Sequence, residues 1–161
     1  MSCGCKIKPL NVPQNVEWGP LFWNVLHGLA ECSGSKTDVN MQRDEKLLWN
    51  KLLTKLHTVL PCSECREHLA SYIQKHPVQI PDNYSELSLY VRQWLHALHE
   101  DVNARLGKQP FAFHQLVRTP DLSKSVYTLT VVMKRAIKAS ALPILSWIHW
   151  SNHARTLSGM Y

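Results

Sequence analysis

Hydrophobic residues along the chain recur at the spacing of α-helices. In five stretches, at 20–29, 44–60, 62–75, 85–106 and 123–150, apolar side chains return every three or four residues. That period gathers them on one side of a helix, whereas a strand alternates apolar and polar residues, and no such alternation persists. The pattern predicts an all-α fold, an antiparallel bundle of four to five helices with an additional C-terminal helical segment.

Proline and glycine mark the predicted ends of these helices. Pro20 suits the first turn of the first helix, and Pro61 ends the second. Gly107 follows the fourth helix as a natural stop, and Pro143 bends or divides the last one. The connecting stretches are polar or contain proline and are predicted to be loops, at 33–40, 76–84 and 108–121.

The helical pattern divides the 161 residues into three segments. Residues 1–15 lack an apolar period and are predicted to be a flexible tail. Residues 16–113 are expected to form the helical bundle, and residues 114–161 are expected to form a helical extension. A chain of this length is long enough to bury one core.

The chain is basic, with a formal net charge of +6, but no block of Lys or Arg concentrates this charge. Without a nucleic-acid motif, the charge indicates a solvated surface and no nucleic-acid partner. Lys134, Arg135 and Lys138 interrupt the apolar segment 126–150, whereas a membrane span needs about eighteen residues with few charges. We expect an amphipathic helix there and no membrane span. The N-terminus lacks the apolar stretch of a secretory signal, which indicates a cytoplasmic protein.

The five cysteines include a pair three residues apart, Cys62-Ser-Glu-Cys65, at the predicted start of a helix. A helix N-terminus carries partial positive charge and free N–H groups, which favour a thiolate and reversible disulfide chemistry. An odd number of cysteines without a secretory signal argues against a secreted disulfide scaffold. Cys62 and Cys65 are therefore the candidate redox pair.

Two alternatives stay open for this pair at this point. The pair is half of a zinc site if other residues complete the ligands, and the candidates are Cys3 and Cys5, His57 or His68. The chain would then be a zinc-binding helical interaction module. Otherwise the pair is incidental in a helical binding protein, and serine at both positions would leave its function intact.

Two further pairs of side chains share helix faces. Trp23 and His27 are four residues apart, and so are His99 and Asn103. A Trp and a His on one face can stack on a heteroaromatic ligand and hydrogen-bond to it. Lys108 follows a helix end, where its extended cation can reach a phosphate. Each face alone also fits ordinary core packing or a solvated polar surface.

Taken together, these motifs resemble the Erv/ALR sulfhydryl oxidases, which are small helical bundles that hold FAD. The resemblance covers about residues 17–111 and keeps the order and separation of the family's three motifs. The motifs stand here as Trp18-Gly19, Trp23 and Leu26-His27; Pro61-Cys62-Ser-Glu-Cys65; and His99, Val102-Asn103 and Leu106-Gly107-Lys108.

The resemblance implies an FAD-dependent thiol oxidase that forms disulfides in dithiol protein substrates. The substrate thiolate would attack Cys62, and Cys65 would pass electrons to FAD and then to oxygen, which gives hydrogen peroxide. Family members are commonly homodimers, so the resemblance also implies a homodimer. The family's cofactor-binding residues correspond here to Gly19, Trp23, His27, His99, Val102, Asn103 and Lys108.

The chain departs from the family pattern at three points. Glu100 follows His99 where many members have Asn, and Leu60 precedes Pro-Cys where an aromatic residue is common. No cysteine follows Cys65, so the extra structural disulfides of some members have no counterpart. Compact virus-encoded members also tend to lack those bridges, which favours a virus-encoded enzyme that acts in the cytoplasm or the virion.

The remaining cysteines and two tryptophans carry further expectations. Cys3 and Cys5 lie where the family often keeps a mobile shuttle disulfide, which would pass electrons from the substrate to the redox pair; incidental thiols or a metal-binding pair are the alternatives. Cys32 is predicted to be a packed free thiol. Trp147 and Trp150 are expected either to pack on the bundle or to form a dimer surface.

Overall fold

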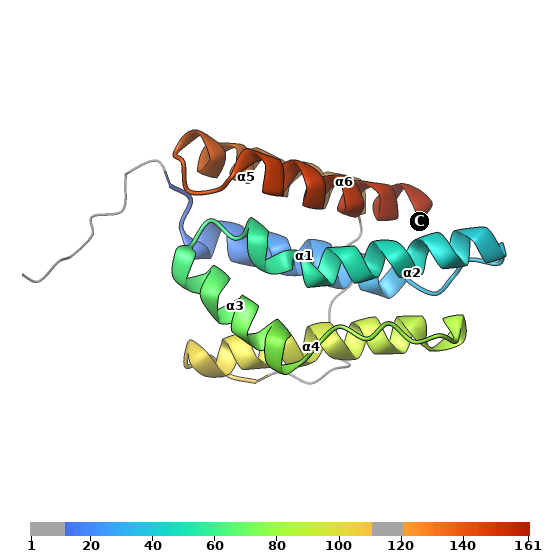
Figure 1. The fold of residues 1–161 in the computed structure, drawn as a ribbon. Coiled ribbons are helices and arrows are strands. Elements are labelled where there is room, and N and C mark those ends of the chain that lie inside the picture. Colours follow the sequence, from blue (N-terminus) through green and yellow to red (C-terminus); the bar gives the residue numbers. More distant parts are fainter. Residues whose placement is uncertain (1–11, 111–120) are drawn as a thin grey trace, which may run out of the picture.

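The architecture is helical throughout the computed structural model, which describes residues 12–110 and 121–161 (Figure 1). Cys3, Cys5 and the predicted boundary at 113 lie outside these ranges. Two 3₁₀ turns, at Leu56–Val59 and Tyr84–Glu86, precede α3 and α4. The α-helices are α1 (Asn15–Cys32), α2 (Val39–Thr54), α3 (Ser63–Lys75), α4 (Leu87–Arg105), α5 (Leu122–Lys138) and α6 (Ile144–Met160). No strand occurs in the described ranges, and the predicted all-α fold is confirmed.

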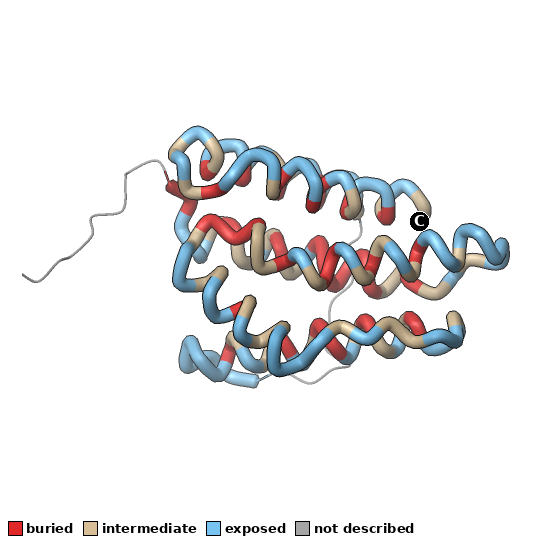
Figure 2. Tube along the Cα trace, viewed as in Figure 1, coloured by how far each residue is buried: buried red, intermediate tan, exposed pale blue. Residues whose placement is uncertain are grey.

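Helix α1 is central because other helices cover it on two sides. Figure 1 shows α1 and α2 between the α5–α6 pair and α4, with α3 crossing from the middle layer towards α4. Trp18, Phe22, Val25 and Leu29 form a buried stripe on α1. The rings of Phe22 and Trp150 lie 5.4 Å apart, so this stripe faces α6. Buried positions gather where helices face one another (Figure 2).

The C-terminal segment folds into two helices that run back along each other. Helix α5 ends at Lys138, and the chain turns through Ser140, whose φ of 56° is left-handed. Pro143 caps the start of α6. The division at Pro143 was one of the two predicted forms. Helix α6 continues to Met160, beyond the predicted end at residue 150.

Trp147 and Trp150 pack on the bundle, which was one of their two predicted roles. They are only 5% and 1% exposed. The Trp150 indole N–H donates to the Leu52 carbonyl oxygen at 3.0 Å, which satisfies a polar group that would otherwise be costly to bury. Helices α5 and α6 therefore share one core with α1 and α2.

The charged residues of α5 lie on the outside of an amphipathic helix, as predicted. Its buried residues recur at helical spacing, at Val126, Leu129, Met133 and Ala136, while Lys134 is exposed. Among the helices of the described ranges, none combines the length and the apolar character that a bilayer span requires.

Two predicted helix starts were wrong. Helix α1 begins at Asn15, not at Pro20, because a capping box closes its first turn and the Gln14 backbone N–H donates to the Glu17 carboxylate at 2.7 Å. Pro20 is tolerated inside the helix because the carbonyl that lacks its usual partner belongs to Val16, an exposed residue.

Helix α2 begins at Val39 and ends at Thr54, earlier at both ends than the predicted 44–60. The Asp38 side chain accepts a hydrogen bond from the Met41 backbone N–H at 3.0 Å, which starts the helix within the predicted loop 33–40. At its other end the chain tightens into the 3₁₀ turn before Pro61 is reached.

A buried carboxylate joins three elements at the end of the bundle remote from α3. Glu45 of α2 is 0% exposed. It accepts hydrogen bonds from the hydroxyls of Tyr84 and Tyr161, the latter at 2.5 Å, and from the Gly34 backbone N–H at 3.1 Å. The Trp49 indole N–H donates to the Tyr161 oxygen at 3.1 Å. Burial and the bond to Glu45 raise the pKa of Tyr84 to about 12, and they raise the pKa of Tyr161 as well.

Candidate functional site

Cys62 and Cys65 form a disulfide at the first turn of α3. Pro61 ends the preceding turn, and Cys62 is the residue that caps the helix, with an extended backbone. Positions three apart at a helix start lie on one side, which brings the two Cα atoms to 5.2 Å. The Cys65 backbone N–H donates to the Cys62 sulfur at 3.2 Å. Both residues are half-buried, so the disulfide is not sealed inside the core.

The start of α1 lies against this disulfide. The side-chain Nδ2 of Asn15 donates to the Cys65 sulfur at 3.7 Å. Asn15 fell within the predicted tail, so sequence reasoning missed it. The capping box Gln14-Asn-Val-Glu17, in which a polar side chain is followed three positions later by Glu, was the available signal that a helix starts there.

A stack of rings joins α1 to α4 farther along α1. The Trp23 ring lies 3.8 Å from the His99 ring, centre to centre, and the planes differ by 7°. His27 Nε2 and His99 Nδ1 are 3.0 Å apart, which is hydrogen-bonding distance. Sequence periodicity had placed Trp23 and His27 on one face of a helix, and the structure brings His99 to that face. A flat ligand that enters between Trp23 and His99 must separate them, because 3.8 Å leaves no room for a third ring.

The two histidines are neutral near pH 7. Burial, assisted by the neighbouring His99 and His96, lowers the pKa of His27 to about 4. Burial also lowers the pKa of His99 to about 4, assisted by the charge of Lys108 and by His96. In a neutral pair one ring donates and the other accepts the shared hydrogen bond. The pair can therefore bind a ligand through hydrogen bonds and does not act as a proton donor at neutral pH.

One polar atom in this stack has no partner inside the described ranges. His27 Nδ1 is buried there without a hydrogen bond, as are Trp18 Nε1 and His57 Nδ1 elsewhere. A buried ring nitrogen without a partner is unusual, and a bound polar ligand would supply one. Gly19 precedes Trp23 by four residues on the same side of α1, and a Cβ built there meets no atom within 4 Å. The protein's own packing does not require glycine at this position, so the open space beside it is available to a ligand.

The end of α4 brings Lys108 back towards Asn103. The Lys108 backbone N–H donates to the Asn103 carbonyl at 2.8 Å, and the Gly107 N–H donates to the Ala104 carbonyl at 3.2 Å. Gly107 has a φ of 67°, a left-handed conformation that glycine adopts without the strain that a Cβ would bring. Asn103 is 7% exposed, Val102 is half-buried, and Lys108 is exposed. Gly107 is the predicted stop, and it also sets where Lys108 emerges.

The zinc alternative gains no support. Among the residues that the structure describes, no three His, Cys, Asp or Glu side chains gather as metal ligands. Cys62 and Cys65 are joined to each other, and His68 pairs with Glu64 at 3.6 Å. Cys32, at the end of α1, is a half-buried free thiol, as predicted. The proposed shuttle residues, Cys3 and Cys5, lie outside the described residues.

The chain is similar to a group of oxidases from viruses and plants. It is 37% identical over 94 residues to an "FAD-linked sulfhydryl oxidase" of African swine fever virus, a match that covers 58% of this chain and 71% of the relative. It is 33% identical over 93 residues to the "FAD-linked sulfhydryl oxidase ERV1" of Arabidopsis thaliana, covering 58% of this chain and 44% of the relative.

A further relative is a "Putative FAD-linked sulfhydryl oxidase" of Invertebrate iridescent virus 6, which is 32% identical over 94 residues, covering 56% of this chain and 80% of the relative. No solved structure matches the chain significantly. The sequence model of the Erv1 / Alr family matches residues 20–120, which is more than half of the chain. The matched range contains the disulfide, the ring stack and the end of α4. The chain therefore belongs to the Erv1/Alr family.

Proposed function

We propose that this chain is an FAD-linked thiol oxidase that forms disulfides in dithiol substrates, with Cys62–Cys65 as its redox disulfide. The observation that carries the proposal is the disulfide itself, half-buried at the start of α3 and in contact with α1. Its relatives are named FAD-linked sulfhydryl oxidases, and they support both the cofactor and the reaction.

The cofactor is proposed to lie along α1, between the disulfide and the ring stack. Asn15 at the disulfide and His27 in the stack are twelve residues apart on this helix, or about 18 Å at about 1.5 Å per residue. FAD carries two ring systems joined by a pyrophosphate, so one ligand can reach both ends. The residues proposed to hold it are Gly19, Trp23, His27, His99, Val102, Asn103 and Lys108.

Each group has a role that its surroundings support. The neutral histidines offer hydrogen bonds, including the one that His27 Nδ1 lacks. Lys108 supplies a positive charge suited to the pyrophosphate. When bound, FAD supplies a two-electron acceptor for the reduced cysteine pair.

The thiol chemistry follows from the position of the cysteines. A substrate thiolate attacks Cys62, a substrate–Cys62 disulfide forms, the Cys62–Cys65 bond breaks, and Cys65 leaves as a thiolate. The second substrate thiolate then displaces Cys62, so the substrate is oxidised by two electrons and the cysteine pair is reduced by two. The Cys65 backbone N–H, which donates to the Cys62 sulfur at the start of α3, stabilises the Cys62 thiolate when the second substrate thiolate displaces it.

Several finer points are part of the same proposal. Protein dithiols are the proposed substrates, oxygen is the final acceptor, and hydrogen peroxide is the product. The proposed active form is a homodimer in the cytoplasm, and Cys3 and Cys5 are the proposed shuttle. Peroxide detection during turnover, light scattering and cell fractionation test the acceptor, the dimer and the location in turn.

The experiment that tests the activity measures bound flavin and the loss of free thiols from a reduced protein. We expect a yellow protein whose Cys65→Ser variant keeps its flavin and has no turnover. Cys32→Ser is the matched control, because Cys32 is a free cysteine at the far end of α1 from the disulfide, and this variant should remain active. A colourless protein that gains no activity on adding FAD would refute the proposal.

The cofactor site has a separate test at Gly19. An added Cβ meets no atom of the protein, so Gly19→Ala should stabilise the flavin-free protein by about 0.5–1 kcal/mol, the usual gain in a helix interior. If FAD occupies the space beside Gly19, the same variant should bind FAD more weakly. Unfolding curves and FAD titrations measure the two effects. Unchanged FAD affinity would remove Gly19 from the site.

A further inference from the structure

We propose that the side-chain amide of Asn15 stabilises Cys65 as the leaving thiolate and that the α5–α6 pair holds this amide in place. The inference rests on the proposed redox role of Cys62–Cys65. It assigns a catalytic contact to Asn15, which precedes the range matched by the family's sequence model, and a positioning role to the C-terminal helices, which follow it.

Each sulfur of the disulfide has its own hydrogen-bond donor. The Cys62 sulfur accepts from the Cys65 backbone N–H at 3.2 Å, within α3. The Cys65 sulfur accepts from Asn15 Nδ2 at 3.7 Å, across to α1. The first donor belongs to the backbone of the same turn and accompanies any helix start. The second comes from a side chain fifty residues away and depends on how α1 and α3 are placed.

This arrangement bears on the first step of thiol exchange. When the substrate thiolate bonds to Cys62, the electron pair of the broken S–S bond remains on Cys65. A thiolate is a stronger hydrogen-bond acceptor than a disulfide sulfur, because bonds to charged groups exceed bonds to neutral groups. Asn15 therefore stabilises the product of this step more than its reactant. A better-stabilised leaving thiolate leaves faster, which favours attack at Cys62.

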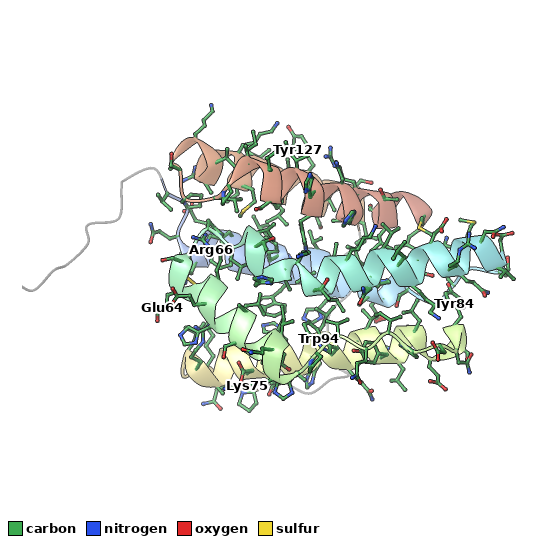
Figure 3. The ribbon with its side chains drawn as sticks, in the orientation of Figure 1. Glu64, Arg66, Lys75, Tyr84, Trp94 and Tyr127 are labelled. Carbon is green, nitrogen blue, oxygen red and sulfur yellow. A yellow bond between two sulfur atoms is a disulfide. The ribbon has the colours of Figure 1, made fainter. Side chains whose placement is uncertain are left out.

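Two contacts tie the helix starts on either side of the disulfide to the C-terminal pair. Glu17, two residues after Asn15, accepts from Arg135 of α5 at 2.9 Å while it closes the first turn of α1. Arg66, next to Cys65, donates to the Leu60 carbonyl at 2.6 Å and to the Ala141 carbonyl, between α5 and α6, at 3.1 Å. Figure 3 shows Arg66 on the side of α3 that faces the α5–α6 pair.

The charged side chains of these two turns are engaged with other groups. Figure 3 shows Glu64 pointing away from the bundle. Glu17 pairs with Arg135, Glu64 pairs with His68, and Arg66 donates to two carbonyl oxygens. The amide of Asn15 is the group whose donor atom contacts the Cys65 sulfur from outside α3. Removing this amide should therefore destabilise the Cys65 thiolate without breaking an ion pair.

The test measures the pKa of the Cys65 thiol in flavin-free, reduced Cys62→Ser protein, from the pH dependence of its alkylation. Mass spectrometry separates Cys65 from the other cysteines. In this background Asn15→Ala should raise the pKa by about one unit, which is a tenfold loss of thiolate below the pKa. Asn15→Asp keeps the shape, removes the donor and adds a negative charge, so it should raise the pKa further.

Asn40→Ala is the matched control. Asn40 is an exposed asparagine in the first turn of α2, as Asn15 is in the first turn of α1. Figure 1 shows that α2 starts at the end of the bundle opposite the start of α3. This variant should leave the Cys65 pKa unchanged. Equal pKa values in the Asn15→Ala, Asn15→Asp and Asn40→Ala proteins would overturn the proposal.

A second readout uses the intact Cys62–Cys65 pair in a dithiothreitol redox buffer, above the pKa of Cys65. Loss of the Asn15 donor destabilises the reduced form, so the disulfide of Asn15→Ala should be about tenfold harder to reduce, or about 30 mV more negative for two electrons. An unchanged potential would count against the proposal. Both assays are done without FAD, so their failure would leave the oxidase activity itself untouched.

The role of the C-terminal pair is tested through Arg135. Arg135→Gln should raise the Cys65 pKa in the presence of Asn15 but add nothing in the Asn15→Ala protein, because its effect passes through the amide. An equal rise in both backgrounds would show that Arg135 acts on Cys65 by another route and would overturn the positioning role. Circular dichroism establishes that each variant is folded.

Discussion

Acidification is expected to destabilise the flavin-free protein through His27. The unfolded chain binds a proton on this ring near pH 6.5, whereas burial holds the pKa in the folded chain at about 4. Between these values the unfolded state binds more protons, so stability is complete above about pH 6.5 and is lost as the pH falls towards 4. The shift of about 2.5 units corresponds to about 3 kcal/mol, at about 1.4 kcal/mol per unit. His99 contributes in the same direction.

Denaturant titrations between neutral pH and about pH 4 measure this loss. His27→Gln keeps a polar side chain that does not titrate, so its stability should fall less steeply than that of the natural chain. Carboxylates protonate in both proteins, and the difference between the two curves isolates His27. His149→Gln, at an exposed position of α6, should give a curve parallel to the natural one. Parallel curves for His27→Gln would refute the reasoning.

Three further predictions concern other parts of the chain. Tyr161→Phe removes a donor from buried Glu45 and should cost about 1–3 kcal/mol in denaturant titrations; a change within error would mean that water replaces the hydroxyl. Gly107→Ala places a side chain at a φ of 67° and should lower the free energy of unfolding by about 1 kcal/mol. It should also weaken FAD binding, because Lys108 is displaced. Unchanged FAD affinity would show that Lys108 does not contact the cofactor. Replacing Cys3 and Cys5 by Ser should spare oxidation of a small dithiol and impair a protein substrate, and equal losses on both would exclude the shuttle.

The sequence pattern correctly predicted those features of the fold that depend on residues close together in the chain. A proline followed by two cysteines three apart, before an apolar stripe, was enough to place Cys62 at a helix start and both sulfurs on one side. Gly107 was predicted as a stop for the same reason. The 3.6-residue period also put Trp23 and His27 on one face, because that relation exists within a single helix.

The pairing of helices was beyond the local pattern. The hydrophobic period shows which side of a helix is apolar, but not which other helix covers that side. No local sequence pattern therefore predicted the contact of Asn15 with Cys65. The bridge from Arg66 to Ala141 also crosses a long stretch of sequence. Pro20 was placed in a first turn by a sound general preference, and the capping box at Gln14 outweighed it.

Because α5 and α6 pack on the bundle, the part of the chain that folds together is longer than the part that matches the family model. The family match ends at residue 120, but Phe22 and Leu52 meet Trp150 beyond that limit. A protein cut at the family boundary would present the apolar stripe of α1 to water and would tend to self-associate. Activity measured on such a truncated protein would reflect a damaged fold and not the properties of the intact enzyme. A chimeric protein that contains the redox segment of this chain therefore also has to contain α5 and α6.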